Sequence, residues 1–330
     1  MSAEIAHRAF SVLGAEIGLV SNYASIIEDD EYFLGKGAKL HSLLSNFHEL
    51  KEIPFTSSHH AYVVVTDSGK IPFSTAGTDR ELYISGPIRQ FEEQTDDKRA
   101  SLFGNMGLFS KFLIQVLEQQ GIYSFHSTSF YHRDTNRLFL VLGGTGSGKS
   151  TVLLKAIHDG YEVFGTELTH VQFCGDDVVF HKGSVYQNCR VGNLVEDFPS
   201  LIERFSIKDV PEENIWHAYL SVDFSSVAAP ENSLKNPEVV MLFPRIEADR
   251  KVPEIFRMNK QGIESKIYDN FCEKISPPSY VYTHEFVPTV DTREAVLRRQ
   301  AFAKRLASYD GLKEVWRNMA SPHMCLDSIL

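Results

Sequence analysis

The chain has 330 residues, of which 43% are hydrophobic and 23% are charged, a composition typical of a folded globular protein with one large domain or two ordinary ones. Its formal net charge of -10 disfavours nucleic acids and anionic membranes as partners. The N-terminal residues lack the pattern of a signal peptide, and no stretch of about 18 residues is apolar throughout. We therefore expect a cytoplasmic protein that binds neither nucleic acid nor membrane.

Residues 1–100 are predicted to form an N-terminal α/β lobe. Within it, residues 60–77 (HAYVVVTDSGKIPFSTAG) hold two β-rich runs on either side of a polar turn, which predicts a hairpin. Residues 81–88 (ELYISGPI) predict another strand, ended by a Gly-Pro pair. The polar and charged residues 90–101 (QFEEQTDDKRAS) are the best candidate for a linker. Residues 101–330 would then form the second domain, with helices at its C-terminal end.

The second domain begins with a predicted helix that ends at Gly121. Five apolar residues share one face of this helix, namely Leu108, Phe112, Leu113, Val116 and Leu117. Two strands are expected around a polar turn at 133–137, and the second strand runs into a glycine-rich loop. A helix over 147–158, closed by Gly160, and a short strand over 161–164 follow. Further on, we expect a hairpin around Lys182-Gly183 and, over 292–319, one long amphipathic helix or two.

Residues 143–150 (GGTGSGKS) fit the phosphate-binding pattern G-x-x-x-x-G-K-[ST]. The predicted strand before the loop and helix after it are the context that this pattern requires. Glycines let successive backbone N–H groups converge on phosphate oxygens, and the N-terminus of the helix adds partial positive charge. The candidate nucleotide-binding residues are Gly143, Gly144, Thr145, Gly146, Ser147, Gly148, Lys149, Ser150 and Thr151.

Two side chains of the loop have separate predicted roles. Lys149 is expected to neutralise charge on the β- and γ-phosphates, and Ser150 to ligate Mg²⁺ through its hydroxyl. Thr151 is expected to be a residue of the helix and not a second metal ligand. The sequence thus predicts ATP and Mg²⁺ as cofactors.

Residues 126–167 (HSTSFYHRDTNRLFLVLGGTGSGKSTVLLKAIHDGYEVFGTE) resemble the catalytic core of HPr kinase/phosphorylase and of the HPr-kinase-related kinases. The resemblance implies an α/β fold with a mixed sheet and a P-loop core of the HPr kinase and phosphoenolpyruvate carboxykinase type. It also implies a kinase that transfers the γ-phosphoryl group to a serine-type hydroxyl of a protein, a peptide or a small metabolite. By the same resemblance, a homo-oligomer is expected.

The resemblance assigns catalytic roles to four residues. His126 matches the histidine that lies near the transferred phosphate in this family. Thr166 and Glu167 fall where HPr kinase has two acids, so Glu167 is predicted to hold Mg²⁺ together with Ser150 and to act in catalysis. Thr166 replaces the acid usually credited with proton transfer and could align a nucleophile or water only by hydrogen bonding. Arg190 matches an arginine of the related kinases and is predicted to stabilise charge on the transferring group.

Replacement of the first acid leaves other functions open. One alternative is a nucleotide-binding regulator or slow ATPase that has lost the catalytic aspartate, and another is a carboxykinase-like or phosphorolytic activity. The pair Asp176-Asp177 is a rival source of acid, but its position predicts a solvated turn. The cysteines have no metal-ligand spacing and are expected to be reduced thiols; they are Cys174, Cys189, Cys272 and Cys325.

Overall fold

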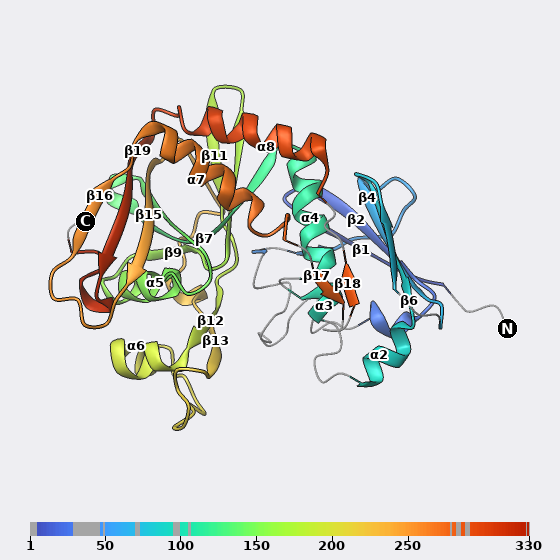
Figure 1. Ribbon diagram of the computed structural model, residues 1–330, viewed down its shortest axis with the longest axis horizontal. Coiled ribbons are helices and arrows are strands. Elements are labelled where there is room, and N and C mark those ends of the chain that lie inside the picture. The colour runs from blue at the N-terminus through green and yellow to red at the C-terminus, as the bar shows by residue number, and fades with distance from the viewer. Residues whose placement is uncertain are drawn as a thin grey trace. The chain divides into compact units, whose positions relative to one another are not determined.

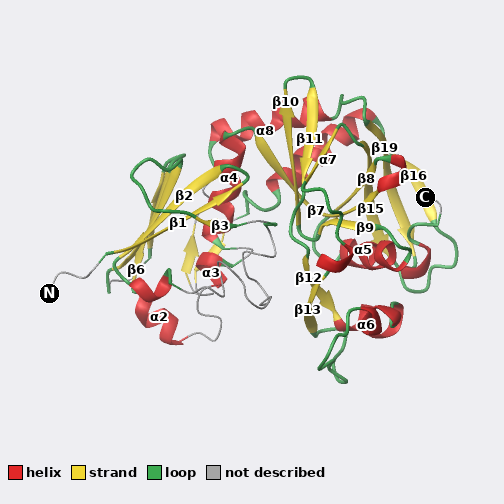
Figure 2. Cartoon of the chain, turned by 180° about the vertical axis from the view of Figure 1, so that it is seen from behind, coloured by secondary structure: helices red, strands yellow, loops and turns green. Residues whose placement is uncertain are grey.

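The computed structural model describes residues 5–28, 47–48, 50–69, 73–94, 100–104, 107–277, 279–281, 285–287, 291–327 and 329. These residues form a mixed α/β protein with two large sheets (Figures 1 and 2). The chain divides into two compact units, Met1–Ile122 with Lys274–Leu297 and Tyr123–Glu273 with Arg298–Leu330. This division falls later than the boundary predicted at residue 100, and Lys274–Leu297 returns to the first unit.

The first unit is built on a six-stranded sheet of order β3-β1-β2-β4-β6-β5. β1 and β2 form an antiparallel hairpin, whereas β4 lies parallel to both β2 and β6. Alternate residues at the start of β4 are fully buried, which places one face of this strand against the core. The strands are β1 (Ala6–Val12), β2 (Ala15–Ser21), β3 (Lys51–Glu52), β4 (Ala61–Asp67), β5 (Ser74–Gly77) and β6 (Glu81–Gly86).

The hairpin predicted over residues 60–77 is wrong. β4 pairs with β6 in parallel and β5 pairs with β6 antiparallel, so β6 lies between the two predicted partners. The polar turn after β4 suggested that the next strand, β5, pairs with it, but the partner of β4 on this side is β6, further along the chain. The strand predicted over 81–88 is confirmed as β6.

Short elements complete the first unit. The predicted linker overlaps the helix α2, and residues 95–99 lie outside the described part of the chain. The other elements are η1 (Ala24–Ile26), α2 (Ile88–Gln94), α3 (Ala100–Phe103), α4 (Leu108–Gln119), β17 (Ser279–Val281) and β18 (Glu285–Val287).

Helix α4 confirms the predicted amphipathic helix, and its polar residues are buried as well. Its buried polar side chains are Ser110, Lys111, Gln115 and Glu118. Lys111 Nζ donates a hydrogen bond to the carbonyl oxygen of Pro277 at 2.6 Å. Burial lowers the pKa of Lys111 to about 8, and the nearby charge of Lys274 lowers it further. The ammonium group is therefore held in a setting that disfavours its charge.

We expect the substitution Lys111→Met to stabilise the protein at neutral pH. Between a pKa of about 8 in the folded protein and the ordinary value of 10.5, the unfolded chain binds a proton that the folded chain has released. Stability of the wild type therefore rises with pH across this window. The stability advantage of the variant should shrink as the pH rises through this window, measured as the difference between thermal unfolding midpoints. The control is Lys266→Met, because Lys266 is exposed. If the difference in unfolding midpoint between Lys111→Met and the wild type did not change with pH, the lowered pKa of Lys111 would be contradicted.

The second unit contains a nine-stranded sheet of order β14-β11-β10-β7-β8-β15-β19-β16, with β9 paired to β7. β8, β15 and β19 run parallel to one another, and the other pairings with a printed register are antiparallel. The strands are β7 (Ile122–His132), β8 (Arg137–Leu142), β9 (Glu162–Gly165), β10 (Leu168–Cys174), β11 (Asp177–His181), β14 (Ser233–Lys235), β15 (Glu238–Ile246), β16 (Glu254–Arg257) and β19 (Leu312–Ala320).

Both faces of this sheet are covered. In β8, Phe139 and Val141 pack in a cluster with residues of α5, whereas Leu138 and Leu140 pack in a cluster with residues of α7 and α8. A strand buried on both faces reads as a continuous apolar run, and residues 138–142 have this pattern. The helices are α5 (Lys149–His158), α6 (Ser200–Arg204), α7 (Lys260–Cys272) and α8 (Arg293–Leu306), with the short helices η3 (Arg133–Thr135), η4 (Asn193–Asp197), η5 (Ser225–Val227) and η6 (Pro322–Met324).

Two predictions for the second half of the chain are wrong. The segment 292–319 begins with helix α8 but ends in strand β19 rather than in a second helix. The hairpin expected around Lys182-Gly183 does not form, because β11 pairs with β10 and β14, while β12 (Tyr186–Arg190) pairs with β13 (Tyr219–Asp223). The observed hairpin joins β10 to β11 through the turn at Gly175-Asp176.

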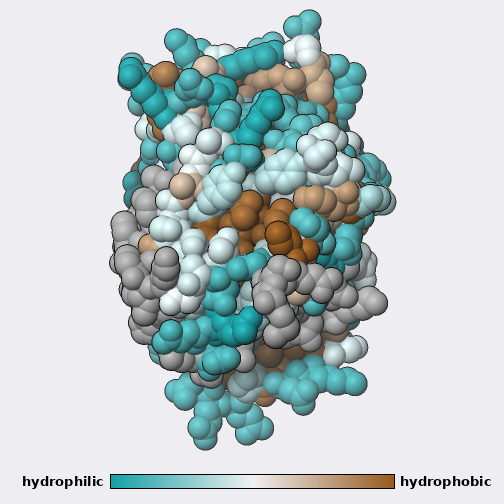
Figure 3. Space-filling model, turned by 90° about the vertical axis from the view of Figure 1, so that its right-hand side faces the viewer, coloured by the Kyte–Doolittle hydropathy of each residue, from teal (hydrophilic) through white to brown (hydrophobic). Residues whose placement is uncertain are grey.

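The face of the molecule drawn in Figure 3 is predominantly polar. On the face in Figure 3, hydrophilic side chains predominate and apolar ones gather in a small central area. The large apolar side chains found exposed within the described ranges are Ile5, Tyr83, Val195, Trp216, Tyr219, Val252, Phe256 and Leu297. None of the helices formed by those ranges has the length and apolar character needed to cross a bilayer.

Candidate functional site

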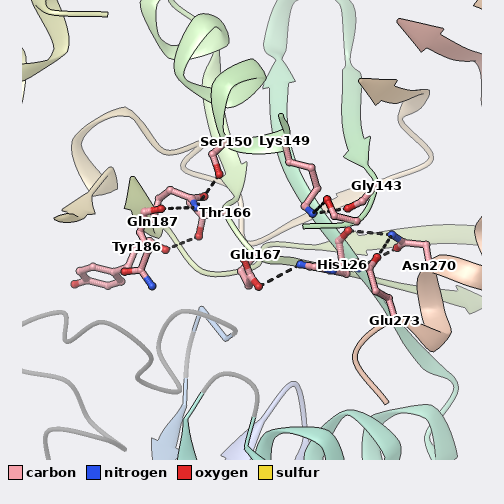
Figure 4. Close-up of polar contacts among 12 residues, drawn as sticks. His126, Gly143, Lys149, Ser150, Thr166, Glu167, Tyr186, Gln187, Asn270 and Glu273 are labelled. Carbon is pink, nitrogen blue, oxygen red and sulfur yellow. Dashed lines mark hydrogen bonds and ion pairs between the residues drawn. The ribbon is translucent and has the colours of Figure 1, made fainter. Parts of the chain in front are cut away.

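The glycine-rich loop joins β8 to α5 in the second unit (Figure 4), in the predicted order of strand, loop and helix. Gly143, Gly146 and Gly148 have φ angles of 142°, 82° and 102°, in the region that favours glycine. Helix α5 begins at Lys149, two residues after the predicted start, because Gly148 is in the left-handed conformation. The loop therefore leads directly to the N-terminus of a ten-residue helix.

Gly148 is also a point of close approach, since a Cβ atom there would lie 2.2 Å from Ile246 Cγ1 at the end of β15. We expect Gly148→Ala to destabilise the second unit by about 2 kcal/mol or more, because strain at positive φ adds to the overlap. Denaturant unfolding followed by tryptophan fluorescence measures this, because Trp216 and Trp316 both belong to the second unit.

Gly160→Ala is the matched control for this substitution. Gly160 has a φ of 93°, but a Cβ there would have no atom within 4 Å. The control should therefore show only the cost of the backbone conformation, about 1 kcal/mol. Equal losses in the two variants would show that Ile246 yields to the added methyl group.

Lys149 is buried at the start of α5. Its Nζ donates to the carbonyl oxygen of Gly143 and lies 3.4 Å from that of Gly144. The backbone carbonyl of Lys149 accepts a hydrogen bond from Thr128 Oγ1 of β7 at 3.1 Å. The ammonium group thus lies against the loop, and strand β7 supports the first turn of the helix.

Ser150 is contacted from a different part of the unit. Gln187 Nε2, from β12, donates to Ser150 Oγ at 3.2 Å. Among the described residues, neither the buried Gln187 Oε1 nor the buried Ser147 Oγ of the loop has a hydrogen-bond partner. Buried polar atoms without partners are rare.

His126 of β7 is fixed through its backbone by Asn270 of α7. Its N–H donates to Asn270 Oδ1 at 3.0 Å, and its carbonyl oxygen accepts from Asn270 Nδ2 at 3.0 Å. This pair of hydrogen bonds is the kind that a neighbouring strand would make. The side chain of Asn270 therefore sets the position of His126 along the strand.

The imidazole of His126 lies between two carboxylates (Figure 4). Nε2 is 3.2 Å from Glu167 Oε1, and Nδ1 is 2.9 Å from Glu273 Oε1. The ring is 9% exposed, whereas the two acids are 22% and 27% exposed. Glu273 also borders the loop, because its Oε1 lies 4.0 Å from the position of a Cβ atom at Gly144. One histidine, two acids and the loop are thus brought together.

The catalytic role predicted for Thr166 finds no support in this geometry. Thr166 is fully buried, and its hydroxyl lies 3.0 Å from the carbonyl oxygen of Ser184 and 2.6 Å from that of Tyr186. The hydroxyl proton is used within the protein, so Thr166 holds β9 against the start of β12. Glu167, the next residue, points the other way and meets His126.

Arg190 of β12 contacts Tyr219 of β13. Its Nη2 donates to Tyr219 Oη at 2.8 Å, and the guanidinium lies 5.5 Å from the centre of the Tyr219 ring. Side chains alternate between the faces of a strand, so Arg190 and Gln187 of β12 point to opposite faces. Because Gln187 reaches Ser150, Arg190 points away from the loop.

Other predicted residues lie where the sequence indicated. Thr151 is a buried residue of α5, and Gly160 follows the helix with a left-handed backbone. Asp176 is an exposed residue of the β10–β11 turn, and Asp177 binds Lys235 and Asn236. The second acidic pair is therefore a surface turn.

Sequence reasoning missed Asn270, Glu273 and Gln187. Asn270 and Glu273 lie at the end of α7, far along the chain from the loop, and no motif marks them. The sequence signal that could have indicated Asn270 was its polar side chain on the same helical face as the apolar Ile267 and Phe271, both of which are buried. Across the described ranges, no three His, Cys, Asp or Glu side chains are grouped so as to hold a metal ion by themselves.

No protein-family model and no curated protein matches the chain. Among solved structures, the chain is similar to the Hpr(Ser) kinase/phosphatase from Coxiella burnetii, with a TM-score of 0.23 and 12% sequence identity. The similarity covers 41% of this chain and 76% of that chain. This likeness is weak and partial.

Proposed function

We propose that the chain is an ATP- and Mg²⁺-dependent phosphotransferase with a P-loop, and that it transfers the γ-phosphoryl group to a hydroxyl of a protein, a peptide or a small metabolite. The observation that carries the proposal is the His126–Glu167 pair beside a glycine-rich loop. A loop of this kind binds phosphate, and the neighbouring pair offers the acid–base group that transfer to an alcohol needs.

The loop suits a triphosphate in its shape and its polar atoms. Left-handed glycines followed by the start of α5 would let backbone N–H groups meet phosphate oxygens. Ser147 Oγ has no hydrogen-bond partner within the described part of the chain and would donate to such an oxygen. On binding, Lys149 would exchange its contact with the loop carbonyls for the β- and γ-phosphates.

The residues present also suit Mg²⁺, which prefers hard oxygen ligands. Ser150 and Glu167 would hold the ion together with phosphate oxygens and water. When bound, the ion would neutralise charge that develops on the phosphates. Gln187 would keep the hydroxyl of Ser150 oriented.

In the reaction, the acceptor oxygen forms a bond to the γ-phosphorus, and the bond from that phosphorus to the bridging oxygen breaks. ADP leaves with the electron pair, and the proton of the hydroxyl is taken up at the His126–Glu167 pair. Proton removal by a positioned base contributes about 10²- to 10⁴-fold to such a step.

The direct experiment incubates purified protein with ATP labelled in the γ-phosphate, Mg²⁺ and a panel of serine peptides and small alcohols. ATP binding is measured in parallel by calorimetry. We expect saturable ATP binding and transfer of label to at least one acceptor. Release of labelled phosphate without labelling of any acceptor would instead favour a slow ATPase or a regulator. The hydroxyl of Thr166, which is hydrogen-bonded within the protein, is compatible with that function. Absence of ATP binding would overturn both.

A further inference from the structure

One surface of the second unit has no task in the proposed function. It is formed by β12, β13 and the segment between them, Tyr186–Asp223, which we call the β12–β13 arm. Figure 1 shows α6, β12 and β13 on the side of α5 that lies away from α7, with the loop after α6 extending beyond them. We propose that the β12–β13 arm docks a protein acceptor of the phosphoryl group through a segment rich in lysine and arginine. This inference rests on the proposed phosphotransferase function and names the class of its substrate.

Large apolar side chains are exposed on the β12–β13 arm. Val195 of η4 is 37% exposed, Trp216 is 40% exposed and Tyr219 is 44% exposed. These are three of the eight large apolar side chains that are exposed in the described part of the chain. Such side chains are ordinary when they occur singly, whereas a group of them on one segment is typical of a surface that binds a protein. Trp and Tyr are also among the residues that contribute most to protein–protein binding.

The backbone around Trp216 is fixed to the end of β12. The N–H of Gly192 donates to the carbonyl oxygen of Ile215 at 2.8 Å. The N–H of Val191 donates to the carbonyl oxygen of Ala218 at 3.0 Å. Gly192 also lies against the Trp216 ring, because a Cβ atom there would be 2.5 to 2.8 Å from three atoms of the indole. The ring is therefore held in place before a partner arrives, which reduces the entropy lost on binding.

The β12–β13 arm is acidic. It contains seven acidic and three basic residues, so it carries a net charge of -4 out of -10 for the whole chain. Asp209, Glu212 and Glu213 are exposed, and none of them forms an ion pair within the described ranges. Glu212 and Glu213 come shortly before Trp216 in the sequence. Exposed carboxylates on a segment with exposed aromatic rings complement lysine and arginine, since the charges attract and the ring faces bind cations.

Tyr219 already makes a contact of the kind expected from a partner. The guanidinium of Arg190 lies 5.5 Å from the centre of the Tyr219 ring, and its Nη2 donates to Tyr219 Oη at 2.8 Å. An arginine of the acceptor would use the exposed part of the Trp216 ring in the same way. The carboxylates of Glu212 and Glu213 would pair with further basic residues of the same segment.

Strand β12 links this surface to the candidate phosphate site. Gln187, near the start of the strand, donates to Ser150 Oγ at 3.2 Å. Gly192, against which Trp216 lies, is five residues further along the chain. Five residues of extended chain span at most about 18 Å. A basic segment docked at Trp216 would therefore place a serine about five residues away within reach of the loop.

The first experiment measures binding without catalysis. The probe is a fluorescein-labelled serine peptide with lysines and arginines about five residues from the serine, and anisotropy gives its Kd for the full chain. We expect it to bind at least about 10-fold more tightly than peptides of equal length with glutamate or glutamine in place of the basic residues. The preference should shrink as sodium chloride is added, because salt screens exposed charges. Equal binding of the three peptides would overturn the inference.

Two variants test whether the β12–β13 arm is the binding surface. Glu212→Lys/Glu213→Lys reverses two exposed charges, and Trp216→Ala removes the ring. The Kd for the basic peptide should rise by about 10-fold or more in each variant. The Kd for ATP should stay within about twofold, because neither change touches the glycine-rich loop. Thermal unfolding shows whether each variant is folded, and the charge reversal, at exposed residues only, decides the result if Trp216→Ala unfolds.

The matched control is Asp134→Lys/Asp176→Lys. Both residues are exposed and belong to the same unit, so the net charge changes by the same amount away from the β12–β13 arm. The control should bind the basic peptide like the wild type. If it lost as much affinity as Glu212→Lys/Glu213→Lys, only the total charge would matter and the inference would be wrong.

Transfer of labelled phosphate separates this inference from the proposed function. In Glu212→Lys/Glu213→Lys, the KM for the basic peptide should rise while kcat stays near the wild-type value, because these residues hold the acceptor and do not touch the reacting atoms. Transfer without any preference for basic peptides would overturn the docking role and leave the proposed function intact. If the wild type bound the basic peptide at this surface but transferred no phosphate to any acceptor, the proposed function would fail and the surface would remain a binding site for a basic protein.

Discussion

Replacing Lys149 by methionine is expected to abolish detectable phosphate transfer, with a loss of about 10³-fold. The side chain keeps its approximate length but loses the only charge that the loop residues 143–150 carry. Removal of one donor that stabilises developing charge costs about 10²- to 10³-fold in rate. Hydrogen bonds to charged groups contribute about 1.5 to 3 kcal/mol, so the Kd for ATP should also rise by about 10- to 100-fold. Calorimetry measures the Kd for ATP, and the labelled-phosphate assay measures the rate of transfer.

Lys155→Met is the matched control on the same helix. Lys155 Nζ forms an ion pair with Asp159 at 2.6 Å, one helical turn further along the chain. Among the described residues, it makes no hydrogen bond or ion pair with the loop. It should bind ATP like the wild type. If Lys149→Met bound and transferred normally, the glycine-rich loop would not be the site of the triphosphate.

The second large effect is expected from Glu167→Gln, which should lower kcat by at least about 10²-fold. The amide cannot hold Mg²⁺ as a carboxylate does, and it offers a weaker acceptor to Nε2 of His126. ATP binding in the absence of Mg²⁺ should be nearly unchanged, because the loop amides and Lys149 remain. The dependence of rate on Mg²⁺ concentration should shift to higher concentrations.

Asp176→Asn serves as the control for Glu167. It belongs to the rival acidic pair and lies exposed in the turn between β10 and β11. Its rate and Mg²⁺ dependence should equal those of the wild type. If Asp176→Asn lost as much activity as Glu167→Gln, the assignment of the catalytic acid to Glu167 would be refuted.

The parts of the site that the sequence could predict are local. Residues 138–142 are apolar throughout, the glycines follow at once, and a helix begins within the next residues, so strand, loop and helix could be inferred from adjacent residues. His126 and Glu167 were found through a resemblance that extends over about residues 126–205. The structure brings these two side chains into contact, although His126 belongs to β7 and Glu167 to the turn between β9 and β10.

The parts that the sequence could not predict depend on distant segments. Glu273 approaches His126 from the end of α7, and nothing in the residues around it differs from an ordinary helix terminus. The alternation of β19 was hidden because Leu312, Val315 and Trp316 also fit a helical spacing. Thr166 shows the same limit, since only the structure reveals that its hydroxyl is tied to two carbonyl groups.

The place of β19 in the sheet has a consequence for synthesis on the ribosome. This strand, close to the C-terminus, lies between β15 and β16, both of which are made much earlier. Until residues Leu312–Ala320 leave the ribosome, the edge of β15 that pairs with β19 stays unpaired. Exposed strand edges favour aggregation. Gly148 packs against Ile246 at the end of β15. The glycine-rich loop therefore gains its final support only after β19 has been translated.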